Sequence, residues 1–146
     1  MNDYDNVTIL LAEDTATDAE MTIRALRKCN LANNPVWVKD GQEALDFLQM
    51  TGDYADRPAG RPRLILLDIK MPRVNGIEVL RYITQTETLR TVPVVMLTSS
   101  AEERDVVESY DLGANSFIVK PVDTEDFYRA VSEVGMYWML VNKVAV

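Results

Sequence analysis

Histidine is absent from the 146 residues, and cysteine occurs only once, as Cys29. Without histidine the chain cannot form a His-ligated zinc site, a Ser-His or Cys-His nucleophilic centre, or a phosphohistidine of its own. A single cysteine cannot form an internal disulfide, and Cys29 lies at an apolar position of a helical pattern, where we expect a buried structural role. Any nucleophilic or metal chemistry on this chain must therefore use other side chains.

Long apolar runs and an excess of basic residues are also lacking. The run "VPVVML" at 92–97 is far shorter than the roughly 20 residues of a membrane span, and the start "MNDYDN" has no signal-peptide features. With 15 basic and 23 acidic residues the net charge is −8, which opposes binding to nucleic acid and to anionic membranes. The sequence predicts a cytoplasmic protein with neither of these partners.

The chain does contain enough apolar residues, 47% of the total, to build the core of one domain. Short β-rich runs alternate with helical patterns, which is typical of an α/β domain with a parallel sheet. The strand candidates are 7–12, 35–39, 64–67, 93–97 and 115–119. We predict a doubly wound (βα)5 flavodoxin-like fold with strand order 2-1-3-4-5 and helices on both faces.

Helix-start signals lie between the predicted strands. Three capping boxes, in which a cap residue is followed three positions later by Glu, are Thr17 with Glu20, Asp40 with Glu43, and Ser100 with Glu103. Two more helices are expected from Asn75 to Gln85 and from near Asp123 onward, where apolar residues recur with a helical period.

Polar side chains stand where four of the predicted strands end. Glu13 and Asp14 follow the first strand, Asp68 the third, Thr98 the fourth and Lys120 the fifth. Because the first and third strands are neighbours in the predicted order, the three carboxylates should converge at one rim of the sheet.

Three carboxylates that lie close together repel one another unless a cation compensates them. Oxygen ligands without histidine or cysteine favour Mg²⁺ over zinc. A phosphoryl group fits the remaining parts, with Asp68 as the nucleophile, Mg²⁺ and Lys120 neutralising its oxygens, and the Thr98 hydroxyl donating a hydrogen bond.

The segments "AED", "LLDIKMP…NG", "LTS" and "IVKP", in this order, resemble the receiver domain of two-component response regulators, the CheY-like fold, over residues 7 to about 135. The resemblance implies that Asp68 is the phosphoacceptor. It also implies that Glu13, Asp14 and the backbone carbonyl of Lys70 join Asp68 in holding Mg²⁺.

The same resemblance assigns three further features. Thr98 and Lys120 contact the phosphoryl group, Phe117 is the switch aromatic, and the Lys120–Pro121 peptide bond is expected to be cis. Two positions depart from the usual pattern: Lys70 places a cationic side chain at the rim, and Phe117 lacks the hydroxyl of the more usual tyrosine.

Other classes of protein use some of these parts. A haloacid dehalogenase-type phosphatase needs a second Asp two residues after its nucleophile, where this chain has Lys70. A flavin-binding module needs a phosphate loop after the first strand, where "AEDTATD" presents acids. A receiver-like adaptor that works without phosphorylation remains the third alternative.

Because the chain has no histidine, the resemblance implies that a histidine kinase or phosphotransfer protein supplies the phosphoryl group. The product would be a changed surface, so we expect a signalling switch and not a conventional enzyme.

The last residues suggest how such a signal is passed on. We expect one receiver domain over 1–146, a helical extension at 136–146 and no output domain. Apolar residues of this extension form a stripe, through which we expect the protein to form a homodimer. The residues of the expected contact are Met136, Trp138, Leu140 and Val144. The long loop at 50–63 and the Trp-containing extension resemble stand-alone receivers that serve bacterial and cyanobacterial phytochromes.

Overall fold

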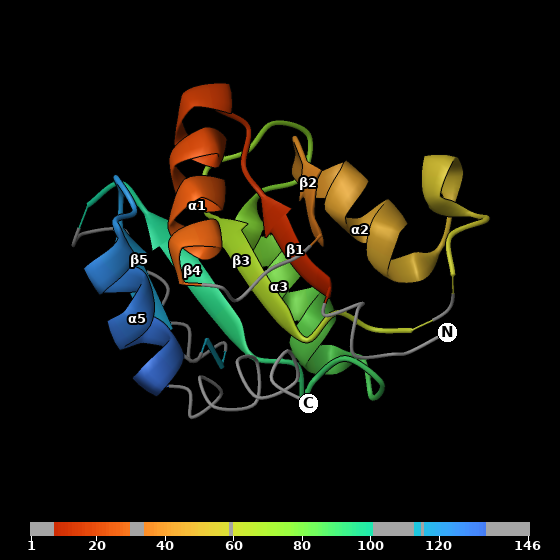
Figure 1. Ribbon diagram of the computed structural model, residues 1–146. Coiled ribbons are helices and arrows are strands. Elements are labelled where there is room, and N and C mark those ends of the chain that lie inside the picture. The colour runs from red at the N-terminus through yellow and green to blue at the C-terminus, as the bar shows by residue number, and fades with distance from the viewer. Residues whose placement is uncertain (1–7, 30–33, 59, 101–112, 115, 134–146) are drawn as a thin grey trace.

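A parallel sheet forms the centre of the molecule. The computed structural model describes residues 8–29, 34–58, 60–100, 113–114 and 116–133. Within them five strands pair in the order β2-β1-β3-β4-β5 (Figure 1). Their bounds are β1 Thr8–Ala12, β2 Asn34–Val38, β3 Leu64–Asp68, β4 Val94–Thr98 and β5 Ser116–Val119. The predicted fold class and strand order are confirmed.

Helices cover both faces of this sheet. Their bounds are α1 Ala16–Lys28, α2 Gly41–Gln49, α3 Gly76–Gln85 and α5 Thr124–Glu133, with a short 3-10 helix, η2, at Gly52–Tyr54. Figure 1 shows α1 and α5 on one face and α2 and α3 on the other. No helix within the described residues is long and apolar enough to cross a membrane.

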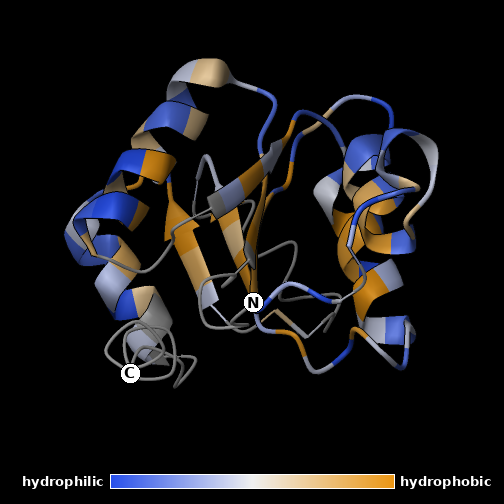
Figure 2. Cartoon of the chain, turned by 45° about the vertical axis from the view of Figure 1, so that its right-hand side comes forward, coloured by the Kyte–Doolittle hydropathy of each residue, from blue (hydrophilic) through white to orange (hydrophobic). Residues whose placement is uncertain are grey.

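Two hydrophobic clusters separate the sheet from these helices. Alternate residues of β1 enter opposite clusters: Ile9 and Leu11 pack on the α1/α5 side, and Leu10 and Ala12 on the α2/α3 side. All residues of β3 and β4 are buried, as expected of central parallel strands covered on both faces. Figure 2 shows these apolar strands between helices whose outer surfaces are hydrophilic.

One predicted capping box is confirmed by the structure, and another extends outside the described residues. The Asp40 carboxylate accepts a hydrogen bond of 2.8 Å from the backbone N–H of Glu43, so the cap of α2 is confirmed. The second, Ser100 with Glu103, extends outside the described residues because Glu103 is not among them.

The predicted cap of α1 at Thr17 is wrong by two residues. The helix begins at Ala16, with Thr15 as its N-cap. The carbonyl of Thr15 already accepts a helical bond from the Ala19 N–H at 2.9 Å. The Thr15 N–H is held by the Glu13 carboxylate at 3.2 Å, so the chain turns into the helix earlier than the capping pattern indicates.

Several predictions fall on parts of the chain that are not described. The residues expected to form a dimer contact, Met136, Trp138, Leu140 and Val144, lie outside the described residues, as does the helix expected after β4. Cys29, by contrast, is buried at the C-terminal end of α1, as predicted.

Gly76 allows α3 to begin directly against the end of β3. Its N–H donates to the Ile69 carbonyl at 2.7 Å, and a Cβ atom at this position would overlap the carbonyl of Asp68. The absence of a side chain at Gly76 therefore lets the start of α3 pack tightly against the backbone carbonyl of Asp68.

The variant Gly76→Ala should lower the free energy of unfolding by about 2 kcal/mol, because helix and strand must separate to admit the methyl group. Urea denaturation followed by circular dichroism measures the change. Alanine has a higher intrinsic helix propensity than glycine by about 1 kcal/mol, so a stabilised variant would contradict this close approach.

Candidate functional site

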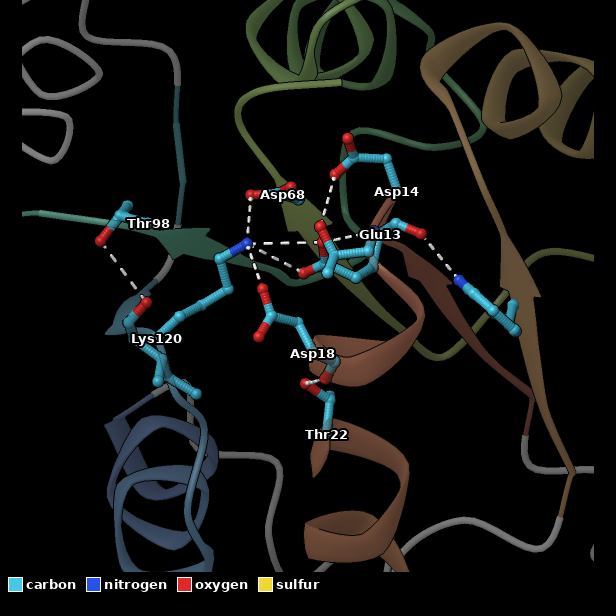
Figure 3. A network of polar contacts seen from close by, with 10 residues as sticks. Glu13, Asp14, Asp18, Thr22, Asp68, Thr98 and Lys120 are labelled. Atoms are coloured by element: carbon cyan, nitrogen blue, oxygen red, sulfur yellow. Dashed lines mark hydrogen bonds and ion pairs between the residues drawn. The ribbon is translucent and has the colours of Figure 1, made fainter. Parts of the chain in front are cut away.

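Three carboxylates meet at the carboxyl ends of β1 and β3. Glu13 and Asp14 follow β1 directly, and Asp68 is the last residue of β3. The two strands pair side by side, and one carboxylate oxygen from each residue lies within 4.8 Å of the others (Figure 3). The predicted convergence of Glu13, Asp14 and Asp68 is therefore confirmed.

Lys120 reaches into this cluster from the end of β5. Its Nζ atom lies 3.2 Å from Glu13 Oε1 and 3.3 Å from Asp68 Oδ1. It also lies 3.2 Å from Asp18 Oδ2, on the first turn of α1. Figure 3 shows all three carboxylates pointing toward the one ammonium group. The Lys120–Pro121 peptide bond is cis, as expected from the sequence.

Burial sets the electrostatics of these groups. Glu13 is fully buried and Asp68 is 3% exposed. Burial, reinforced by the charge of Glu13 and opposed by Lys120, raises the pKa of Asp68 to about 7. Burial also raises the pKa of Glu13, against the Thr15 N–H and the Lys120 ammonium, which lower it. Glu13 and Asp68 therefore ionise less readily than ordinary acids, even with the Lys120 ammonium beside them.

The pKa of Lys120 responds to two opposing effects. Burial lowers it, whereas the charges of Asp68 and Glu13 raise it. The charges prevail, so the pKa lies above the ordinary lysine value and the side chain is an ammonium at neutral pH.

Three other predicted site residues lie on β4, on β5 and in the loop after β3. Thr98, at the end of β4, is buried, and its hydroxyl donates to the Ile118 carbonyl at 3.5 Å. Phe117 of β5 is partly buried and packs against the hydrophobic cluster between the sheet and the helices α2 and α3. Lys70 is exposed in the loop between β3 and α3.

Two residues of the site were not predicted from the sequence. Asp18 contacts Lys120 from α1, and the only sequence signal is its position as an acid four residues after Asp14. The Trp37 indole N–H donates to the Glu13 carbonyl at 2.7 Å. Trp37 lies on β2, the other neighbour of β1, so only the strand order points to this contact.

The donor set fits a hard divalent cation. The three clustered residues offer carboxylate oxygens alone, and two of them are buried with raised pKa values. Mg²⁺ prefers oxygen ligands and is bound through a few carboxylates. A cation here would relieve the repulsion that Lys120 leaves uncompensated.

Comparison with known proteins places this chain in a family. The family model "Response regulator receiver domain" matches residues 9–132. Response regulator Rcp1 of Synechocystis sp. is 37% identical over 90% of this chain and 88% of its own. The structure of its Mn²⁺-bound form has a TM-score of 0.72, at 35% identity over 91% of this chain and 93% of that chain.

Two other solved structures are similar over nearly the whole chain. The bacteriophytochrome response regulator AtBRR is 52% identical, with a TM-score of 0.85, over 90% of this chain and 94% of its own. The phosphorylated cyanobacterial phytochrome response regulator RcpA is 36% identical, with a TM-score of 0.73, over 92% and 94%. The chain therefore belongs to the response regulator receiver domain family.

Proposed function

We propose that this receiver accepts a phosphoryl group on Asp68 from a histidine kinase or phosphotransfer protein, and that it signals through changed protein contacts. The observation that carries the proposal is the meeting of the buried Asp68 carboxylate with Lys120 and two further acids at one rim of the sheet. This arrangement provides a nucleophile beside a fixed cation.

In the proposed step an oxygen of the Asp68 carboxylate attacks the donor phosphorus. A new O–P bond forms, the bond from phosphorus to the donor breaks, and the leaving group takes that electron pair. Lys120 lies 3.3 Å from Asp68 Oδ1, where its ammonium can neutralise phosphoryl oxygens. The Thr98 hydroxyl, on the adjacent strand end, is proposed to exchange its bond to Ile118 for one to the phosphoryl group.

The metal site belongs to the same proposal. Glu13, Asp14, Asp68 and the backbone carbonyl of Lys70 would hold Mg²⁺. When bound, the ion supplies charge that neutralises the phosphoryl oxygens and the clustered acids. Mn²⁺ binding by the related Rcp1 supports this part of the proposal.

The response is proposed to pass through Phe117. Its ring is only partly buried, at the edge of the α2/α3-side cluster, so it can change position without opening the core. Movement of Thr98 toward a phosphoryl group would leave space on β4 next to β5, the strand that carries Phe117.

The donor is proposed to be a phytochrome-linked histidine kinase. AtBRR and RcpA are named as bacteriophytochrome and cyanobacterial phytochrome response regulators, and both resemble this chain over 90% or more of its length. RcpA was solved in its phosphorylated form, which supports phosphorylation of this chain as well.

Intact-mass spectrometry tests the phosphoacceptor. We expect acetyl phosphate or phosphoramidate to add one phosphoryl group to the wild type in the presence of Mg²⁺, and the adduct to be labile in alkali. The variant Asp68→Asn should gain none. The matched control is Asp56→Asn, which removes an exposed carboxylate outside the site and should behave as the wild type. A phosphorylated Asp68→Asn variant, or a wild type that gains nothing from either donor, would contradict the proposal.

A further inference from the structure

The ammonium group of Lys120 is fully engaged by carboxylates of the chain itself. It has three N–H donors, and three carboxylates surround it. Glu13 accepts at 3.2 Å, Asp18 lies at 3.2 Å and Asp68 at 3.3 Å from Nζ (Figure 3). A phosphoryl oxygen that needs a hydrogen bond from Lys120 must therefore displace one of these partners.

The three carboxylates differ in how easily they can leave. Glu13 is fully buried, and its carboxylate also accepts from the Thr15 N–H at 3.2 Å. Asp68 is the proposed acceptor and stays in the site. The Asp18 side chain is 30% exposed, so water can replace Lys120 as its partner. Asp18 is also outside the cluster of three acids that fits a metal.

We propose that Asp18 is a positioning residue that occupies Lys120 before phosphoryl transfer and gives up this contact when the phosphoryl group arrives. The inference rests on the proposed function and adds a residue that controls its rate. Opening the Asp18–Lys120 contact forms part of the barrier to phosphorylation. The negative charge of Asp18 also faces an incoming anionic donor at the exposed side of Lys120.

The variant Asp18→Asn tests this role because it keeps the shape of the side chain and removes its charge. We expect it to be phosphorylated by acetyl phosphate about 3- to 10-fold faster than the wild type at saturating Mg²⁺, as a tenfold change corresponds to about 1.4 kcal/mol in the barrier. The dissociation constant for Mg²⁺ should stay within about twofold. If Asp18 only supported the structure of the site, the variant would not raise the phosphorylation rate while leaving the dissociation constant for Mg²⁺ unchanged.

Two further variants make the test specific. Glu20→Gln removes the same charge from an exposed position of the same helix and should leave the rate unchanged. Asp18→Glu restores the charge and should return the rate toward that of the wild type.

The outcomes distinguish this inference from the proposed function. A wild-type or slower rate in Asp18→Asn, or an equal acceleration in Glu20→Gln, overturns the role of Asp18 while the wild type is still phosphorylated. A wild type that gains no phosphoryl group overturns the proposed function, and this inference with it.

Discussion

Replacing Lys120 with methionine is expected to lower the free energy of unfolding by about 3–5 kcal/mol at pH 8 in EDTA, as is typical when one partner is removed from a buried ion pair. Its side chain is 14% exposed, and it is within 3.3 Å of carboxylates on Glu13, Asp18 and Asp68. Methionine fills a similar volume, so the loss reflects the missing charge and not a cavity. Urea denaturation of both proteins measures it.

The stability that Lys120→Met loses relative to the wild type should become smaller as the pH falls. The pKa of Lys120 is raised on folding, so its contribution to stability is fully present at pH 8, below the unfolded lysine value. Without the ammonium, the buried acids Glu13 and Asp68 lose an interaction that lowers their pKa values. The folded variant then takes up protons as the pH falls, and the difference from the wild type should shrink between pH 8 and pH 5.

Arg129→Met is the matched control. Arg129 pairs with Asp126 at 3.1 Å, but its side chain is 59% exposed. Exposed ion pairs contribute about 0–1 kcal/mol, so this variant should remain close to the wild type at both pH values. If Lys120→Met lost no more stability than Arg129→Met, the buried network would not depend on its lysine.

Much of the fold and site could be predicted because local patterns and global topology agree. Strand-end acids after β1 and β3 can meet only if these strands are neighbours, and the alternation of strands with helices predicts that order. The chemical types of Glu13, Asp14, Asp68 and Lys120 then limited the possible chemistry. Each of these residues stands at a strand end, where a parallel sheet fixes its location.

The contacts that were missed come from elements whose orientation the sequence does not specify. Asp18 reaches Lys120 from the first turn of α1, which begins at Ala16, earlier than the capping pattern indicates. Trp37 reads as an ordinary strand residue, and its hydrogen bond to Glu13 depends on the register between β1 and β2. Both contacts depend on tertiary packing, which sets the orientation of α1 and the register between β1 and β2.

Asp68→Asn is expected to have the opposite effect on stability from Lys120→Met. In EDTA at pH 8 the variant should unfold with a free energy about 2 kcal/mol higher than that of the wild type. Burial raises the pKa of Asp68 from 3.8 to about 7, and a shift of this size corresponds to about 4 kcal/mol against the charged form. This net shift already includes the favourable pairing of Asp68 with Lys120. Asn avoids the penalty, but its buried amide has its own desolvation cost, so the gain is smaller than the full shift.

The sign follows from proton linkage. Because the pKa of Asp68 is raised on folding, its charge destabilises the folded state above about pH 7, and the penalty disappears as the pH falls toward the unfolded value of 3.8. The advantage of Asp68→Asn should therefore be largest at pH 8 and decrease toward pH 5. Urea denaturation at the two pH values measures it, with Asp56→Asn, an exposed acid, as the control.

Added Mg²⁺ shows whether the higher stability of Asp68→Asn comes from the metal site or from the removal of any negative charge. A ligand that binds only the folded state stabilises it in proportion to its affinity, and the proposed site in the wild type has one more carboxylate than in Asp68→Asn. Saturating Mg²⁺ should therefore narrow the gap between the two proteins, or reverse it, while Asp56→Asn follows the wild type. An Asp68→Asn protein that is less stable than the wild type at pH 8 in EDTA would mean that Lys120 compensates the clustered acids fully, and the repulsion invoked for the metal site would be absent.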